Sequence, residues 1–138
     1  MKAITKILIL DKNSKILVLV RGDTHPKFAG HLDFPGGEVE PGENSLKAII
    51  REVKEEIDLD FNHEDVKLLF DSNINDYLAH SLYSYKLGEI EPKITISWEH
   101  SSYMWVDKDQ LIAGKLPENV DPYYRDVINY LKAIKDYE

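Results

Sequence analysis

The segment from Gly37 to Leu59 reads GEVEPGENSLKAIIREVKEEIDL, and the interpretation of the whole chain starts from it. Apolar residues in its second half recur at intervals of three and four, which predicts a helix over residues 44–57 with one buried stripe. The stripe consists of Leu46, Ile49, Ile50, Val53 and Ile57. The run Pro35, Gly36, Gly37 precedes the helix and predicts a sharp turn, because glycine permits backbone conformations and close approaches that a side chain forbids.

Three glutamates share one face of the predicted helix. Glu52, Glu55 and Glu56 stand at positions i, i+3 and i+4, and Glu56 borders the apolar stripe. Their like charges repel one another and burial makes ionisation costlier, so a bound divalent cation would relieve both effects. Clustered carboxylates suit Mg²⁺ or Mn²⁺, and a backbone carbonyl of the preceding turn could complete the coordination. The ordinary alternative is a solvated acidic helix face, which the glutamates alone would favour.

A second cation site is excluded by its own spacing. Asp58, Asp60 and Asn62 match the opening of an EF-hand calcium loop. However, His63 stands where that loop requires glycine, and Leu69 stands where it requires a bidentate glutamate.

The spacing of the opening segment resembles the Nudix box. In that pattern a glycine and a glutamate enclose five residues, and seven more lead to Arg-Glu-aliphatic-any-Glu-Glu-any-Gly-aliphatic. Here Gly37, Glu43 and the run from Arg51 to Leu59 match every fixed position except one, because Asp58 stands where the family has glycine. That position lies at the end of the helix, where a left-handed residue is favoured, and Asp tolerates this conformation better than most residues.

The resemblance implies one α/β domain over residues 1–138, with the box at 37–59. The implied fold is the Nudix fold, an α/β/α sandwich around a mixed β-sheet. It also implies an enzyme, a hydrolase of phosphoric anhydride bonds that cleaves a nucleoside diphosphate linked to another moiety. Water would attack phosphorus with the help of a bound metal ion.

The resemblance also assigns roles by position. Glu52, Glu55, Glu56 and the Gly37 carbonyl would hold Mg²⁺, with Mn²⁺ as a substitute. Arg51 would orient the glutamates through salt bridges. The general base is open between a box glutamate such as Glu55 and a later one.

Two further glutamates are placed around this set by the same resemblance. Glu99 is the later acidic residue, either as base or as an additional metal ligand, and a solvated loop glutamate is the equal alternative. Glu43 is expected to support Arg51 or the loop rather than to bind metal.

Candidates for contacts with substrate lie outside the box. Arg21 ends a predicted strand, and its guanidinium is suited to bidentate phosphate binding. His25 and Lys27 follow in the adjacent loop and are weaker candidates. Tyr77 resembles the tyrosine of dinucleoside polyphosphate hydrolases in its distance from the box, although eight tyrosines make a coincidence easy.

The remaining elements are predicted from patterning and turn residues. Strands are expected at residues 4–10, 15–20, 66–70, 78–87, 93–98 and 103–106, with a short extended segment at 31–34. A short helix is expected at 107–113 and a longer one at 121–137. In the longer helix, Asp121 is the expected cap and Pro122 suits the first turn.

Composition narrows the class of protein further. The formal net charge of −8 argues against binding to DNA or RNA, which requires a basic face. The chain has no cysteine, so disulfides and thiolate chemistry are excluded, and a cytoplasmic location is expected. The apolar N-terminal runs are too short to span a membrane. A homodimer is possible from the resemblance alone, without an identified surface.

Several functions stay open at this point. A nucleoside triphosphate is the first choice of substrate, with a dinucleoside polyphosphate as the variant that Tyr77 favours. A non-catalytic Nudix-like nucleotide sensor is disfavoured, since a pure binder has no need of every metal ligand. An isopentenyl diphosphate isomerase is opposed by the lack of cysteine. A structural protein with an acidic helix would give the Pro-Gly-Gly turn no purpose.

Overall fold

The structure, a computed structural model, describes residues 1–23, 30–114 and 121–134. In these ranges the strands are β1 (Lys2–Leu10), β2 (Ile16–Arg21), β3 (Leu32–Asp33), β4 (Gly36–Glu38), β5 (Lys67–Asn75), β6 (Leu78–Lys86) and β7 (His100–Val106). The helices are α1 (Ser45–Ile57), α2 (Lys108–Ala113) and α3 (Pro122–Ala133), with one 3₁₀ turn, η1 (His63–Asp65). None of the described helices is both long enough and apolar enough to cross a bilayer.

β1 is the central strand of a mixed sheet. The strand order is β3-β2-β1-β6-β5, with β4 also paired to β1 and β7 to β2. β1 runs parallel to β6 from Lys2↔Leu78 to Leu10↔Lys86, and antiparallel to β2 and β4. Such a strand is covered on both faces, which explains why residues 7–10 are all apolar and fully buried.

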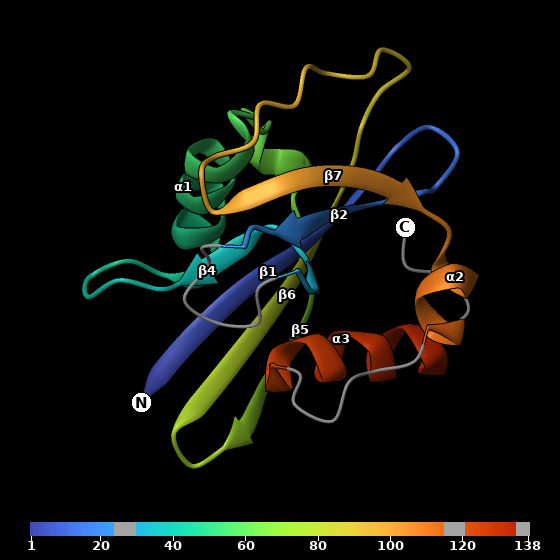
Figure 1. Ribbon diagram of the computed structural model, residues 1–138. Helices are drawn as coiled ribbons and strands as arrows, with labels where there is room; N and C mark the ends of the chain where they lie inside the picture. The colour runs from blue at the N-terminus through green and yellow to red at the C-terminus, as the bar shows by residue number, and fades with distance from the viewer. Residues whose placement is uncertain (24–29, 115–120, 135–138) are drawn as a thin grey trace.

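Helices cover the two faces of this sheet (Figure 1). Alternate residues of β1 point to opposite sides. Ile7 and Ile9 pack with the apolar stripe of α1, whereas Ile4 and Leu8 pack with α3. The two separate cores confirm the predicted α/β/α sandwich.

The ends of α1 follow the sequence closely. The Asn44 side chain accepts a hydrogen bond from the Lys47 amide at 2.8 Å and caps the first turn. At the other end, Asp58 has φ 55° and ψ 43°, and its N–H donates to the Lys54 carbonyl. The prediction that Asp58 takes the left-handed position of the usual glycine is therefore confirmed.

Three predictions about elements are wrong. Residues 93–98 form no strand, because their amides bond to the end of α1: Thr95 N–H donates to the Ile57 carbonyl at 3.1 Å and Ser97 N–H to the Glu56 carbonyl at 2.8 Å. The last helix ends at Ala133 instead of near 137, and residues 135–138 lie outside the described part. Asp121 makes no side-chain cap, because its carboxylate binds Arg21.

Candidate active site

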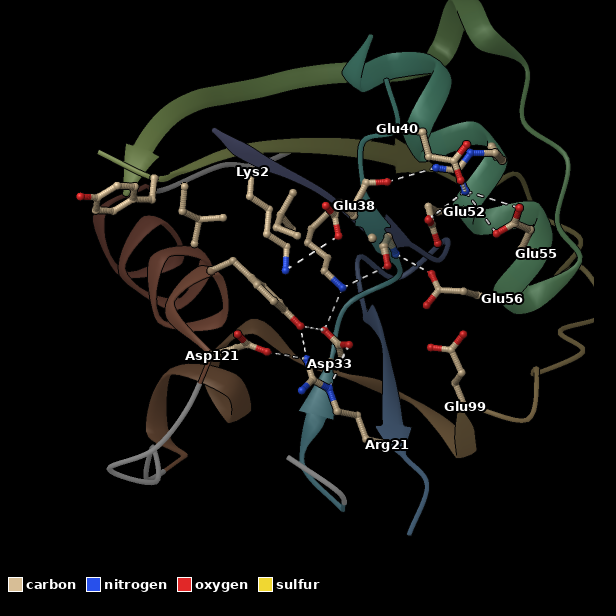
Figure 2. Close-up of a pocket in the computed structure, with 18 of the residues that line it drawn as sticks. Lys2, Arg21, Asp33, Glu38, Glu40, Glu52, Glu55, Glu56, Glu99 and Asp121 are labelled. Atoms are coloured by element: carbon tan, nitrogen blue, oxygen red, sulfur yellow. Dashed lines mark hydrogen bonds and ion pairs between the residues drawn. The ribbon is translucent and has the colours of Figure 1, made fainter. Parts of the chain in front are cut away.

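One cavity of about 640 Å³ gathers the site residues that the sequence singled out (Figure 2). It lies where β1, β4 and α1 meet the beginning of α3. The predicted residues on its wall are Arg21, Gly37, Arg51, Glu52, Glu55, Glu56, Tyr77 and Glu99. His25 and Lys27 lie outside the described residues. Residues that are up to 78 positions apart in the sequence thus share one concave surface, as expected of a ligand site.

Arg51 holds the acidic side of the cavity together. Its Nη2 and Nε donate to the two carboxylate oxygens of Glu43 at 2.7 and 3.1 Å. Its Nη1 donates to Glu52 at 2.9 Å and lies 3.3 Å from Glu55 Oε2. Nη2 also binds the Glu38 carbonyl at 3.1 Å. One guanidinium therefore orients the carboxylates by bidentate and bridging contacts, and Glu43 supports Arg51 as expected.

Burial increases along the three box glutamates. The exposed fraction of the side chain falls from 59% in Glu55 through 18% in Glu52 to 8% in Glu56. Burial raises the pKa of Glu56 to about 8, although Lys6 acts in the opposite direction. Burial also raises the pKa of Glu52, against the effect of Arg51. The deepest carboxylate is therefore one that a cation would stabilise in its charged form.

The turn before α1 fits closely around two of these carboxylates. The Gly36 amide donates to Glu56 Oε1 at 2.7 Å. A Cβ at Gly37 would lie 2.6 Å from the Glu52 carboxylate carbon, so a side chain at this position would displace Glu52. The absence of a side chain thus leaves a cradle in which carboxylates approach the backbone.

The donor set of this cradle suits a hard divalent cation. Carboxylate oxygens such as those of Glu52, Glu55 and Glu56 are the ligands that Mg²⁺ and Mn²⁺ prefer, and Gly37 lines the same cavity. As the described side chains stand, no three of their carboxylates and imidazoles are close enough to enclose an ion. Glu52 and Glu55 are instead ion-paired with Arg51, whose guanidinium orients them at the cavity wall.

Glu99 stands on the opposite side of the deepest glutamate. Its carboxylate points toward Glu56 from the segment that precedes β7 (Figure 2). Its backbone carbonyl accepts a hydrogen bond from Gly22 at 2.9 Å, which fixes this segment against the end of β2. The next residue, His100, is buried with Nε2 3.9 Å from Glu56 Oε2. His100 is therefore a buried neighbour of Glu56 and not a surface residue.

Arg21 lies on the cavity wall and is part of a buried ion-pair network. Its side chain is only 5% exposed, and Nε donates to Asp33 Oδ2 at 3.2 Å. Nη2 donates to Asp121 Oδ2 at 3.1 Å and also contacts the Tyr123 hydroxyl. These partners hold the Arg21 guanidinium in a buried network of ion pairs and hydrogen bonds, and its contact with phosphate stays a prediction.

The floor of the cavity contains residues that sequence reasoning missed. Asp33 Oδ1 accepts hydrogen bonds from Lys6 at 3.2 Å and from the Tyr123 hydroxyl at 2.9 Å. Burial alone would raise the pKa of Asp33, but Lys6 and Arg21 lower it below its usual range. One available signal was the position of Lys6 in the apolar run ITKILIL, between Ile4 and Leu8 on the same strand face.

Tyr77 marks the outer edge of the cavity. It occupies the turn between β5 and β6, where it is 79% exposed and adjacent to the cavity residues Asn75 and Leu78. An aromatic ring with this exposure contributes little to the core. It is therefore accessible to a ligand that extends beyond the carboxylates.

Comparisons with known proteins agree with this geometry. The sequence model of the NUDIX domain matches residues 2–131. The 8-oxo-dGTP diphosphatase of Escherichia coli (strain K12) is 37% identical over 57 residues, which cover 41% of this chain and 43% of that protein. The asymmetrical bis(5'-nucleosyl)-tetraphosphatase of Rattus norvegicus is 33% identical over 86 residues, 58% of each chain. The chain thus spans about half the length of these curated relatives. The solved structure of a MutT protein from Methanosarcina mazei Go1 matches with a TM-score of 0.72 at 23% identity, over 94% of this chain and 91% of that one.

Proposed function

Because the chain belongs to the NUDIX family, we propose that it is a divalent-metal-dependent pyrophosphohydrolase of small nucleotides. The observation that supports this most directly is the single cavity in which Arg51, three box glutamates and Glu99 converge. The bond to be cleaved is a phosphoanhydride of a nucleoside diphosphate linked to another moiety. A nucleoside triphosphate is the first choice of substrate, in line with the name of the Escherichia coli relative.

The chain's own residues would prepare this reaction in three ways. Glu52, Glu55 and Glu56 would hold Mg²⁺ or Mn²⁺ together with the Gly37 carbonyl, while Arg51 keeps the carboxylates aligned. When bound, the ion would lower the pKa of a coordinated water and offset the negative charge of the diphosphate. Glu99 and Glu55 are the two candidates for the base that takes the proton from the attacking water, since both reach the cavity.

A dinucleoside polyphosphate is the second candidate substrate. The exposed Tyr77 ring at the outer edge of the cavity would suit a second base, which a triphosphate lacks. The rat relative, named as a bis(5'-nucleosyl)-tetraphosphatase, supports the same choice. Replacement of Tyr77 by Ala should then reduce hydrolysis of dinucleoside polyphosphates more than that of triphosphates.

The wider context is part of the same proposal. We place the protein in the cytoplasm, where small nucleotides and free Mg²⁺ are at hand and where a chain without cysteine suits a reducing medium. It would act on free nucleotides and not on nucleic acid polymers. The possible homodimer is tested by measuring the molar mass in solution by light scattering.

Formation of mononucleotide products from a nucleotide panel, followed by chromatography with Mg²⁺ or Mn²⁺ present, tests the activity. The panel should contain nucleoside triphosphates, dinucleoside polyphosphates and nucleoside diphosphate sugars. We expect turnover to fall by roughly 10²–10⁴-fold in Glu55→Gln and in Glu56→Gln. The matched control is Glu64→Gln, which changes an exposed glutamate in η1 away from the cavity.

Two outcomes would contradict the proposal. Activity that survives both box substitutions would remove these glutamates from the site. Tight nucleotide binding by the unaltered protein without turnover of any panel member would instead indicate a sensor.

A further inference from the structure

Lys6 is a buried lysine in the middle of the central strand. It is 3% exposed, and burial of an ammonium group is costly unless each of its N–H donors finds an acceptor. Here Nζ lies 3.2 Å from Asp33 Oδ1, 3.1 Å from the Phe34 carbonyl and 3.1 Å from the Gly36 carbonyl. It also lies 4.5 Å from the centre of the Tyr123 ring. All three donors are therefore used within the protein, which argues against a direct contact between Lys6 and substrate.

Two of these acceptors belong to the turn that leads into the box. The carbonyls of Phe34 and Gly36 point at Lys6, and the Pro35 carbonyl between them accepts from the Ile7 amide at 3.1 Å. Three successive carbonyls of the turn are thus bound by two successive residues of β1. Gly36 has φ 132°, and a Cβ there would lie 2.1 Å from the Thr5 carbonyl oxygen. The turn is therefore pressed against the strand at the point where Lys6 emerges.

The same turn sets the position of two box glutamates. With its carbonyl bound by Lys6, Gly36 directs its amide to Glu56 Oε1. The adjacent Gly37 supplies the surface on which the Glu52 carboxylate rests. A shift of this turn by a fraction of an ångström would therefore move both carboxylates relative to each other.

We propose that Lys6 is a positioning residue that fixes the 34–37 turn before any cation binds and so sets where the carboxylates of Glu52 and Glu56 stand. The inference rests on the proposed metal-dependent function. It assigns to one buried side chain the preorganisation that partners of metal ligands commonly provide. If Lys6 acted only as a nearby positive charge, it would repel the metal ion, and its removal would strengthen metal binding. If Lys6 positions the turn, its removal should weaken metal binding.

The first test compares the Mn²⁺ affinity of Lys6→Met with that of Lys2→Met, measured by calorimetry and by electron paramagnetic resonance. Lys2 is on the same face of β1 and lines the same cavity, but among the described residues its Nζ pairs with the exposed Glu38 carboxylate alone, at 3.8 Å. We expect Lys6→Met to weaken Mn²⁺ binding by roughly 10–100-fold. Lys2→Met should change it by less than about threefold. Unchanged or tighter binding in Lys6→Met would overturn the proposal, because it would leave Lys6 with an electrostatic role alone.

The second test uses the unaltered chain and decides the question if Lys6→Met does not fold. Amide hydrogen exchange of Gly36 is followed by NMR with and without Mg²⁺. We expect this amide to be protected in the metal-free protein, and Mg²⁺ to change its protection by less than about threefold. Free exchange that becomes protected only with Mg²⁺ would show that the metal, not Lys6, orders the turn.

Neither test requires turnover, so the two proposals fail separately. If no nucleotide is hydrolysed, the turn and its Mn²⁺ affinity are still measured. If Lys6→Met binds Mn²⁺ normally while the unaltered chain hydrolyses nucleotides, only the role of Lys6 is lost.

Discussion

Asp33 and Glu56 are buried to almost the same degree in one cavity, since 4% and 6% of the whole residue is exposed. Their pKa values nevertheless shift in opposite directions. Burial raises both. For Asp33 the nearby Lys6 and Arg21, with hydrogen bonds from Tyr123 among others, more than offset burial and lower the pKa. For Glu56, Lys6 and the Gly36 amide are too weak to do so, and the pKa rises to about 8.

The negative charge of Asp33 is compensated by nearby cations of the protein, whereas that of Glu56 is not. The floor around Asp33 supplies its own cations, so this carboxylate is satisfied by the folded chain. The wall around Glu56 supplies more carboxylates instead, since Glu52 lies beside it and Glu99 faces it. An incompletely compensated buried carboxylate either keeps a proton or takes up a cation. The first arrangement is typical of structure and the second of a functional site.

The largest expected effect on stability is that of neutralising Asp33. Asp33→Asn would leave Lys6 and Arg21 buried with one fewer anion, and we expect a loss of about 3–5 kcal/mol in the free energy of unfolding. Urea denaturation at pH 7 measures it. Asp60→Asn is the control, because Asp60 is ion-paired with Lys54 on the surface and should cost less than about 1 kcal/mol.

The contribution of Asp33 to the free energy of unfolding should also depend on pH. Its pKa in the folded state lies below the usual value of 3.8, so its contribution is present above about pH 4 and is lost as the pH falls further. Equal losses in Asp33→Asn and Asp60→Asn would place the two ion pairs in one class and remove the distinction between floor and surface.

Glu56 should show the opposite sign. Its pKa is about 8 in the folded state, whereas the ordinary value for a glutamate is 4.5, so the folded state binds the extra proton between these values. Stability of the metal-free protein should therefore fall as the pH rises from about 4.5 to 8. Glu56→Gln should remove this slope and raise the free energy of unfolding at pH 7 by about 3 kcal/mol.

Thermal unfolding in a pH series with and without Mg²⁺ measures this effect. Mg²⁺ should flatten the slope in the unaltered chain and leave Glu56→Gln unchanged. A metal-free protein whose stability rises between pH 5 and 8, with no difference in Glu56→Gln, would mean that Glu56 is compensated in the same way as Asp33.

The sequence predicted the acidic side of the cavity, formed by the box glutamates and Arg51, much better than the floor around Asp33. The reason is physical. Glu52, Glu55 and Glu56 are brought together by helical periodicity alone, and Arg51 and Glu43 are near in sequence. Asp58 could likewise be interpreted from local backbone preferences. These relations depend on a few neighbouring residues, so spacing reveals them.

The floor depends on contacts between distant parts of the chain. Lys6 meets Asp33 across 27 positions, and Arg21 meets Tyr123 across 102. Asp121 shows the result: next to Pro122 it matches a helix cap, yet its carboxylate is bound by Arg21. The expected strand at 93–98 failed similarly, because the end of α1 offers carbonyl acceptors that no local pattern reveals.

The smallest effect is expected at Asp58, which caps the end of α1 and does not line the cavity. Asp58→Gly would relieve the left-handed backbone conformation at φ 55° and remove a negative charge from the helix C-terminus. It would also lose the surface pair with Lys54 at 2.9 Å and make the unfolded chain more flexible. We expect a net gain of about 0.5 kcal/mol, or roughly 2 °C in Tm. Asp58→Asn isolates the effect of the charge, since Asn also tolerates this conformation.

Hydrolysis and Mn²⁺ affinity should not change in either variant of Asp58, because Asp58 does not line the cavity. A loss of activity in Asp58→Gly at unchanged Tm would instead extend the wall to the end of the helix, where the carbonyls of Glu56 and Ile57 hold the segment that leads to Glu99.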